Sequence, residues 1–201
     1  MKRLVLASKS PRRREILTNA GIEFELRTAD VEEIPQAGEN PVAYVRRLCA
    51  SKAEAVPVSG DEVVLGADTI VVVDDRILEK PADAEDAARM LRQLSGRSHE
   101  VVTGICLRAA SGAQVVDHAV TRVRVAAMTD DEIAWYVATG EPMDKAGAYG
   151  IQGKMSRWVE GVDGCYLNVV GLPLIEVVSL LSGEGFPVYF NWLNRAEVDA
   201  A

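Results

Sequence analysis

The chain has few of the residues on which several common kinds of site depend. It holds only two histidines, His99 and His118, which disfavours a histidine-rich metal site or a Ser-His-Asp triad. Its three cysteines lie far apart and form no C-x-x-C pair, so we expect three reduced and mostly buried thiols. The patterns G-x-x-x-x-G-K-[ST] and G-x-G-x-x-G are absent, which disfavours a P-loop and a dinucleotide-binding fingerprint.

Long apolar runs and an excess of positive charge are also missing. The apolar run at residues 4–7 is too short for a signal-peptide core, and no stretch reaches the length of a transmembrane helix. We therefore expect a cytoplasmic protein with no membrane-bound part. The formal net charge of -8 disfavours nucleic acid as the main partner, because an acidic surface repels a phosphate backbone. A small anionic substrate would need a local basic pocket or a metal ion.

The residues that are present describe a folded α/β protein. With 201 residues, 48% of them hydrophobic, the chain is long enough for one core or for two small lobes. Strand patterns and helix-start signals alternate along it. We predict a mixed sheet with flanking helices and two lobes around a cleft, with strands near residues 4–7, 24–27, 63–65, 70–73, 101–107 and 115–125, and helices beginning near residues 10, 40, 83, 129 and 172.

Two segments carry polar residues in places that need an explanation. Residues 8–14 join a strand end to a helix start and contain three arginines, which are unfavourable in a first helical turn unless an anion offsets them. Solvated arginines beside a capped helix are the alternative. Asp68 lies within an apolar strand pattern, where a carboxylate needs a cation, a metal ion or strong donors nearby.

Other charged residues are less specific on their own. Glu33 follows another glutamate before a loop, and adjacent acids of this kind are usually surface residues. Lys52 and Lys80 are equally ordinary when each is considered alone. Residues 145–153 contain three glycines close to Lys145 and Gln152, which indicates close backbone approach to a ligand or, alternatively, a tight connection with a surface glutamine.

Taken in order, several segments resemble the motifs of the Maf family. They are LASKSPRR at residues 6–13, GADT at 66–69, LEKP at 78–81, LSG at 94–96, HEVVTG at 99–104, KAGAYGIQG at 145–153 and NVVGLPL at 168–174. The resemblance implies a fold shared with inosine-triphosphate pyrophosphatases, in a single catalytic domain over residues 1–201 whose lobe boundary is not assignable. It also implies metal-dependent hydrolysis of a nucleoside triphosphate between its α and β phosphates.

The resemblance also assigns roles to individual residues. Asp68 is expected to orient or deprotonate the attacking water, and Glu33 to hold a divalent cation, Mg²⁺ or Mn²⁺, together with Asp68. The triphosphate is expected to contact Ser8, Arg13, Lys52 and Lys80. Base recognition is expected from Arg12, Thr69 and Gln152. Lys9 and Glu79 stand where relatives often have glycine.

The segment KAGAYGIQG at residues 145–153 resembles the family branch that hydrolyses dTTP and UTP. Lys145 and Gln152 distinguish it from the 7-methyl-GTP branch, and an amide side chain suits the O4 and N3–H edge of uracil or thymine. The expected function is therefore removal of dTTP, UTP and modified pyrimidine nucleotides from the nucleotide pool. The alternatives are a nucleotide-binding regulator of septum formation and a pyrophosphatase directed at 7-methyl-GTP or inosine triphosphate. The resemblance also suggests a homodimer, with Trp135, Trp158 and Trp192 in the core or, less expected, at the interface.

Overall fold

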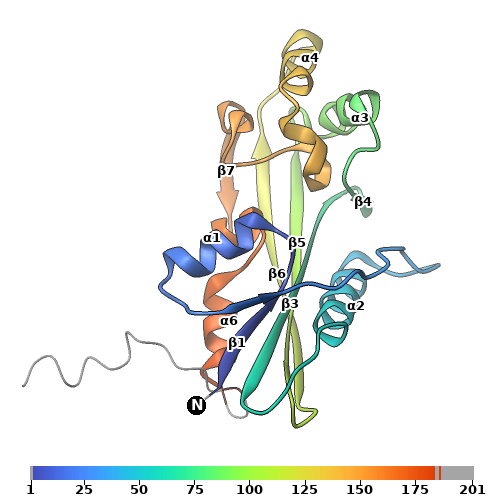
Figure 1. Ribbon diagram of the computed structural model, residues 1–201. Helices are drawn as coiled ribbons and strands as arrows, with labels where there is room; N and C mark the ends of the chain where they lie inside the picture. Colours follow the sequence, from blue (N-terminus) through green and yellow to red (C-terminus); the bar gives the residue numbers. More distant parts are fainter. Residues whose placement is uncertain (1, 184–185, 187–201) are drawn as a thin grey trace, which may run out of the picture.

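One mixed sheet of seven strands organises the part of the chain that the computed structural model describes, residues 2–183 and 186 (Figure 1). Six strands follow the order β2-β1-β3-β5-β6-β7, and β4 pairs with β3. β1 is parallel to β2 and β3, while the other pairings are antiparallel. The strands are β1 (Arg3–Ala7), β2 (Glu25–Arg27), β3 (Glu62–Val73), β4 (Arg76–Leu78), β5 (Ser98–Ala109), β6 (Gln114–Val125) and β7 (Val159–Asp163).

Within the described residues, six α-helices and three 3-10 turns accompany the sheet. The helices are α1 (Pro11–Asn19), α2 (Pro41–Glu54), α3 (Ala84–Leu94), α4 (Asp130–Ala138), α5 (Tyr166–Val170) and α6 (Leu174–Leu181). The 3-10 turns are η1 (Glu141–Asp144), η2 (Ala146–Ala148) and η3 (Lys154–Arg157). The predicted mixed sheet with flanking helices is confirmed.

The local signals for helix starts were mostly reliable. Asn40 accepts a hydrogen bond from Ala43 N, Asp83 accepts one from Asp86 N, and Thr129 with Glu132 forms a capping box. The helix predicted to begin near residue 10 starts at Pro11 without a side-chain cap. Ser10 makes no cap bond, and its own N–H donates to the Ser8 hydroxyl instead, at 3.2 Å.

The strand predictions were less complete. Residues 62–73 form one continuous strand, whereas strands were predicted near residues 63–65 and 70–73. The strands predicted near residues 101–107 and 115–125 are confirmed as β5 and β6, which form a hairpin with its turn between Ala109 and Gln114. The short elements β4, β7 and α5 were not predicted. They contain only three to five residues each, too few for hydrophobic periodicity to be read.

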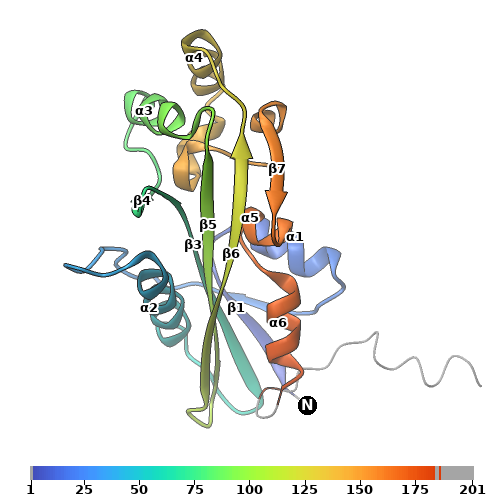
Figure 2. The same cartoon turned by 180° about the vertical axis from the view of Figure 1, so that it is seen from behind.

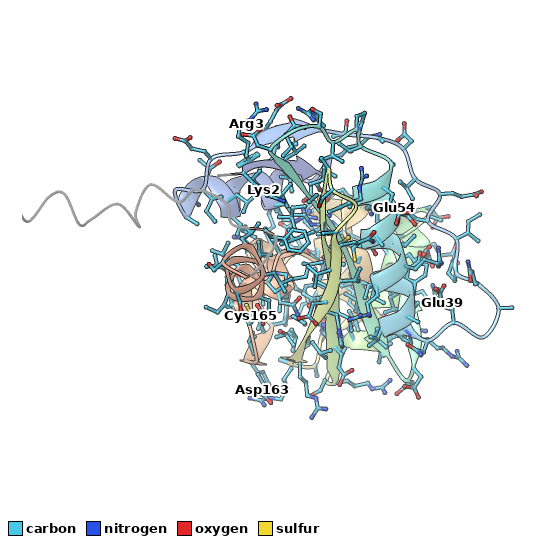
Figure 3. All side chains as sticks on the ribbon, turned by 90° about the horizontal axis from the view of Figure 1, so that it is seen from below. Lys2, Arg3, Glu39, Glu54, Asp163 and Cys165 are labelled. Carbon is cyan, nitrogen blue, oxygen red and sulfur yellow. The ribbon has the colours of Figure 1, made fainter. Side chains whose placement is uncertain are left out.

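Helix α2 packs against one face of the sheet, and α1 and α6 lie on the other side (Figure 3). Residues of α3, α4 and α5 also belong to the core on that other face. Two glycines bring α2 unusually close to the strands. A Cβ atom on Gly66 would lie 2.2 Å from the carbonyl oxygen of Cys49, and one on Gly104 would lie 2.3 Å from that of Val45. Any larger residue would therefore push the helix away from the strands that carry Asp68 and its neighbours.

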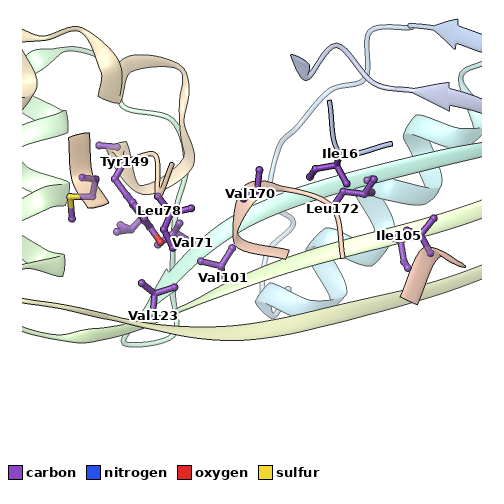
Figure 4. Packing of buried hydrophobic residues seen from close by; sticks show 14 of the residues in the cluster. Ile16, Val71, Leu78, Val101, Ile105, Val123, Tyr149, Val170 and Leu172 are labelled. Carbon is purple, nitrogen blue, oxygen red and sulfur yellow. The ribbon is translucent and has the colours of Figure 1, made fainter. Parts of the chain in front are cut away.

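The long strands β3, β5 and β6 run through both lobes of the molecule (Figures 1 and 2). One lobe holds β1, β2, α1, α2 and α6, and the other holds α3, α4 and β7. A continuous apolar cluster connects them, from Ile105 and Leu172 at one end to Leu78 and Tyr149 at the other (Figure 4). The two lobes thus share one core.

The cysteine and tryptophan side chains differ in their exposure. All three cysteines are free; Cys49 and Cys106 are buried and Cys165 is partly buried. Trp158 is buried, whereas Trp135 is 44% exposed, and Trp192 lies outside the described residues. Within residues 2–183, no helix has the length and apolar character that crossing a bilayer requires.

Candidate active site

A cleft of about 770 Å³ opens where the parallel strands end. β1 stops at Ala7, which lies beside Gly66, and β3 continues past that point into the second lobe. Ligand sites of open α/β sheets commonly lie at the carboxyl ends of such strands. The structure brings all nine sequence-predicted site residues to this one cleft: Ser8, Arg12, Arg13, Glu33, Lys52, Asp68, Thr69, Lys80 and Gln152.

Strand alternation separates Asp68 from Thr69. Successive side chains of β3 point to opposite faces of the sheet, so Asp68 lies on the face covered by α2 and Thr69 on the other. The ammonium group of Lys52, on α2, lies 2.6 Å from Asp68 Oδ1. The cation that the sequence required beside Asp68 is therefore present, which is why the strand continues through this residue.

Glu33 completes a three-residue charge cluster. Its Oε1 also lies 2.6 Å from Lys52 Nζ, so one ammonium group joins two carboxylates from different parts of the chain. Burial raises the pKa of Glu33, but the hydrogen bond and charge of Lys52, with the charges of Lys80 and Arg13, outweigh it. The pKa of Glu33 thus lies below its usual value, and this side chain is ionised at neutral pH.

Arg13 is buried and largely engaged by the protein. Its Nε donates to the carbonyl of Gly171 at 2.8 Å, and its terminal nitrogens donate to Ser8 Oγ, to the carbonyl of Ala67 and to Thr69 Oγ1 at 3.2, 2.8 and 3.0 Å. A guanidinium group has five N–H donors. Four of them are therefore directed at protein atoms, and Arg13 ties α1 to β3 and to the end of α5.

Tyr44 is a cleft residue that the sequence prediction missed. It sits on the apolar face of α2, yet its hydroxyl lies 2.8 Å from Glu79 Oε1 and 3.1 Å from the main-chain carbonyl of Glu33. Tyr44 therefore connects the loop carrying Glu33 to the segment carrying Glu79 and Lys80. The available signal was its place in a buried helical stripe, where a tyrosine hydroxyl needs a polar partner.

The opposite end of the cleft is built from 3-10 turns and loops. Arg12 lies 3.4 Å from Asp144 Oδ2, and Lys145 Nζ lies 2.5 Å from Asp144 Oδ1 and 2.7 Å from the carbonyl of Glu141. Gln152 is exposed and lines the same end. Asp144 and Glu141 were also missed by the sequence prediction, because single acids in a polar turn carry no distinguishing pattern.

The carboxylates fit a divalent cation that is shared with a substrate. No group of three or more His, Cys, Asp or Glu side chains with the spacing of a metal cage occurs within residues 2–183. Mg²⁺, however, is commonly held by one or two carboxylates together with substrate phosphates. Asp68 and Glu33 converge on the single point that Lys52 Nζ occupies, which provides such a pair.

Comparison with known proteins gives consistent results. A family model described as "Maf-like protein" matches residues 3–184. A dTTP/UTP pyrophosphatase of Koribacter versatilis is 54% identical over 90% of this chain and 94% of its own length. A dTTP/UTP pyrophosphatase of Pelotomaculum thermopropionicum is 49% identical over 94% of this chain and all of its own.

One solved structure supports the fold. A HAM1 protein from Coxiella burnetii superposes with a TM-score of 0.51, over 90% of this chain and 99% of that one. Its sequence identity is 16%, so the likeness concerns the arrangement of the sheet and helices alone.

Proposed function

The chain belongs to the Maf family, and on that premise we propose that it hydrolyses dTTP and UTP to the nucleoside monophosphate and pyrophosphate. The observation that carries the proposal is the meeting of Asp68, Glu33 and Lys52 in a cleft whose other walls hold arginines, lysines and a glutamine. Relatives about half identical to the chain bear the name of this activity.

Asp68 is the residue we assign to the attacking water. It is nearly buried on a central strand, and in the absence of nucleotide one of its oxygens bonds to Lys52. The other oxygen can accept a proton from water as the water attacks the α–β phosphoanhydride. The water oxygen joins phosphorus, the bridging P–O bond breaks, and pyrophosphate leaves.

The basic residues bind the triphosphate. Lys80 is exposed at the cleft and is unpaired in the ion pairs found among the described residues, so it can meet phosphate oxygens directly. Ser8 lies just before α1, beside the free backbone N–H groups of the first helical turn. Arg13 has four of its five N–H groups engaged, so its main contribution is to hold Ser8 and Thr69 in place while its positive charge attracts the phosphates.

A divalent cation, Mg²⁺ or Mn²⁺, held by Asp68 and Glu33 would neutralise charge that develops on the departing pyrophosphate. Without nucleotide, Lys52 joins these two carboxylates. When a nucleotide binds in the cleft, the ammonium group of Lys52 turns toward its phosphates. This reassignment needs only rotation of a long, flexible side chain. Lys52 thus keeps the acidic pair compensated when no nucleotide is bound.

The base is read at the other end of the cleft by Arg12 and Gln152. The amide of Gln152 offers one donor and one acceptor group, as the edge of uracil or thymine requires. Thr69 contributes less directly, because its hydroxyl contacts Arg13, Thr103 and the Gly171 carbonyl. It fixes the floor of the cleft between the two ends.

The remaining features belong to the same proposal. A single catalytic domain is supported by the core that the two lobes share among the described residues, and its bounds of 1–201 stay a prediction. Three free cysteines support a reducing compartment such as the cytoplasm. The homodimer stays a prediction, and a sedimentation measurement on the full chain tests it.

Pyrophosphate release from a panel of nucleotides tests the proposal. The panel contains dTTP, UTP, CTP, GTP, inosine triphosphate and 7-methyl-GTP, each with Mg²⁺, with Mn²⁺ and with EDTA. We expect metal-dependent release that is highest for dTTP and UTP. Highest release from a purine nucleotide would overturn the specificity. No release from any nucleotide, with binding retained, would favour a regulatory nucleotide-binding protein.

A further inference from the structure

One pair of side chains holds both ends of the segment that carries Gln152. The buried hydroxyl of Tyr136, on α4, accepts a hydrogen bond from Gly150 N at 3.1 Å and donates one to Glu141 Oε1 at 2.8 Å. The carboxylate of Glu141 in turn accepts from Lys154 N, at 3.0 and 3.1 Å to its two oxygens. Residues 150 and 154 are thus tied to the same two side chains.

The carboxylate is pressed against the backbone of this segment. A Cβ atom on Gly153 would lie 2.0 Å from Glu141 Oε1, so only glycine leaves room for the contact. The Glu141 side chain is 15% exposed, and Tyr136 is fully buried. Burial raises the pKa of Glu141, but the bonds from Lys154 N and Tyr136 outweigh it, so the pKa lies below its usual value. The acceptor is therefore charged, and its bonds to the N–H and O–H donors are strengthened.

Gln152 lies between the two tied ends. Gly153 N donates to the carbonyl of Gly150 at 3.0 Å, which closes a turn around Ile151 and Gln152. Ile151 is buried and anchors the turn to the core, while Gln152 stays exposed at the cleft. The position of the amide is therefore set by the backbone beneath it, and that backbone is set by Tyr136 and Glu141.

We propose that Tyr136 and Glu141 are positioning residues for base selection: they fix the segment 150–154 and so determine which base edge Gln152 can meet. The inference rests on the proposed function and deepens it. A polar group selects a substrate strongly only when it cannot move to satisfy a competitor. Releasing the segment should therefore weaken discrimination between bases more than it weakens hydrolysis. Asp68 and Glu33, the carboxylates at the phosphate end of the cleft, lie on other parts of the chain and should stay in place.

The test compares Tyr136→Phe and Glu141→Gln with the wild-type chain. For each protein, kcat/KM is measured for dTTP, UTP, CTP and GTP. We expect the ratio of dTTP to GTP to fall by about tenfold in both variants, with GTP hydrolysis itself changed by no more than about threefold. Glu132→Gln is the matched control, because Glu132 caps α4 in the same lobe, glutamine also serves in a capping box, and it does not contact residues 150–154.

A second comparison separates positioning from a general structural role. In a Gln152→Ala background, Glu141→Gln should cause no further change in the dTTP-to-GTP ratio, because the side chain that it positions is gone. If Tyr136→Phe does not fold, Glu141→Gln decides alone. An equal loss for all four nucleotides, or an unchanged ratio, overturns the inference. A wild-type chain that hydrolyses none of them overturns the proposed function first, so the two failures are distinguishable.

Discussion

The two ends of the cleft are built in different ways. At the phosphate end, Asp68 stands in the middle of a 12-residue strand and Lys52 on a 14-residue helix packed against it. At the base end, Asp144, Lys145 and Gln152 belong to 3-10 turns and short loops. The chemistry thus rests on regular elements that pack tightly, and selection rests on segments that neighbouring side chains hold in place.

The carboxylates Asp68 and Asp144, one at each end, also differ in burial. The side chains of Asp68 and Lys52 are 8% and 16% exposed, whereas that of Asp144 is 65% exposed. Exposed ion pairs contribute little, while a nearly buried carboxylate that loses its partner is costly. Substitutions at the phosphate end should therefore affect both turnover and folding, and those at the base end should mainly change preference among nucleotides.

Among the substitutions at the phosphate end, Asp68→Asn should reduce turnover most. We expect turnover to fall by about 10³-fold, since the amide cannot accept the proton of the attacking water. Nucleotide binding should be nearly retained, because Lys52 and Lys80 can still meet the phosphates and the base end is untouched. Single-turnover kinetics and calorimetric titration with dTTP measure the two quantities. Turnover within tenfold of the wild type would rule out the assigned role of Asp68.

Lys52→Met should have the next largest effect. It removes the cation that joins Asp68 and Glu33, and we expect kcat/KM to fall by about 10²-fold. Mn²⁺ should also bind more tightly in the absence of nucleotide, because no ammonium group competes for the two carboxylates. Electron paramagnetic resonance of free Mn²⁺ measures this affinity.

Lys9→Met is the matched comparison for that variant. Lys9 also lines the cleft, but its ion pair with Asp30 is exposed on both sides, so its loss should cost less than about tenfold in kcat/KM. Equal losses from the two lysine substitutions would contradict the distinction drawn between buried and exposed charge.

Much of the phosphate end could be predicted from the sequence because its signals are local. Asp68 inside an apolar run required a cation, and the caps at Asn40 and Asp83 were sufficient to place helix starts. The identity of that cation was not predictable from the residues alone. Lys52 appears ordinary on its own helix, and only packing of α2 on the sheet brings it to Asp68.

The base end was harder to predict because the contacts that shape it are not local in the sequence. Tyr136 and Glu141 act through hydrogen bonds to backbone atoms, and backbone donors leave no mark in a sequence. Gly153 was visible as one of three clustered glycines, but the carboxylate that requires it was not. The strand β7 was missed because it is a five-residue edge strand containing a glycine and two acids.

Gly66→Ala tests whether helix packing supports the phosphate end. The added methyl group would meet Cys49 O at 2.2 Å and Ala53 N at 2.8 Å, both main-chain atoms, so α2 must shift. We expect a loss of about 2 kcal/mol in the free energy of unfolding, together with reduced turnover because Lys52 moves with the helix. Urea denaturation and dTTP hydrolysis report the two effects. Gly161→Ala is the control, since its methyl group would meet only the flexible end of Arg124, and a loss there as large as at Gly66 would contradict this account.

His99 should make the free energy of unfolding fall in mild acid. Its Nε2 bonds to the Tyr149 hydroxyl at 2.7 Å, Nδ1 has no partner among the described residues, and burial lowers the pKa of His99 to about 4. The unfolded chain, where the pKa is near 6.5, therefore binds more protons than the folded chain, and stability falls as pH drops from about 6.5 toward 4. Between pH 7 and 5.5 the loss from this residue is about 1 kcal/mol. Hydrogen bonds from Arg27 and from the backbone of Ser59 lower the pKa of Glu62 from 4.5 to about 2. Protonation of that carboxyl therefore changes stability mainly below pH 5.5.

Urea denaturation of the wild type and of His99→Gln at pH 7 and pH 5.5 measures that loss. Glutamine keeps a hydrogen-bonding group for Tyr149 but cannot take up a proton in this range, so the variant should lose about 1 kcal/mol less than the wild type over the interval. Identical pH dependence in the two proteins would show that folding does not lower the pKa of His99.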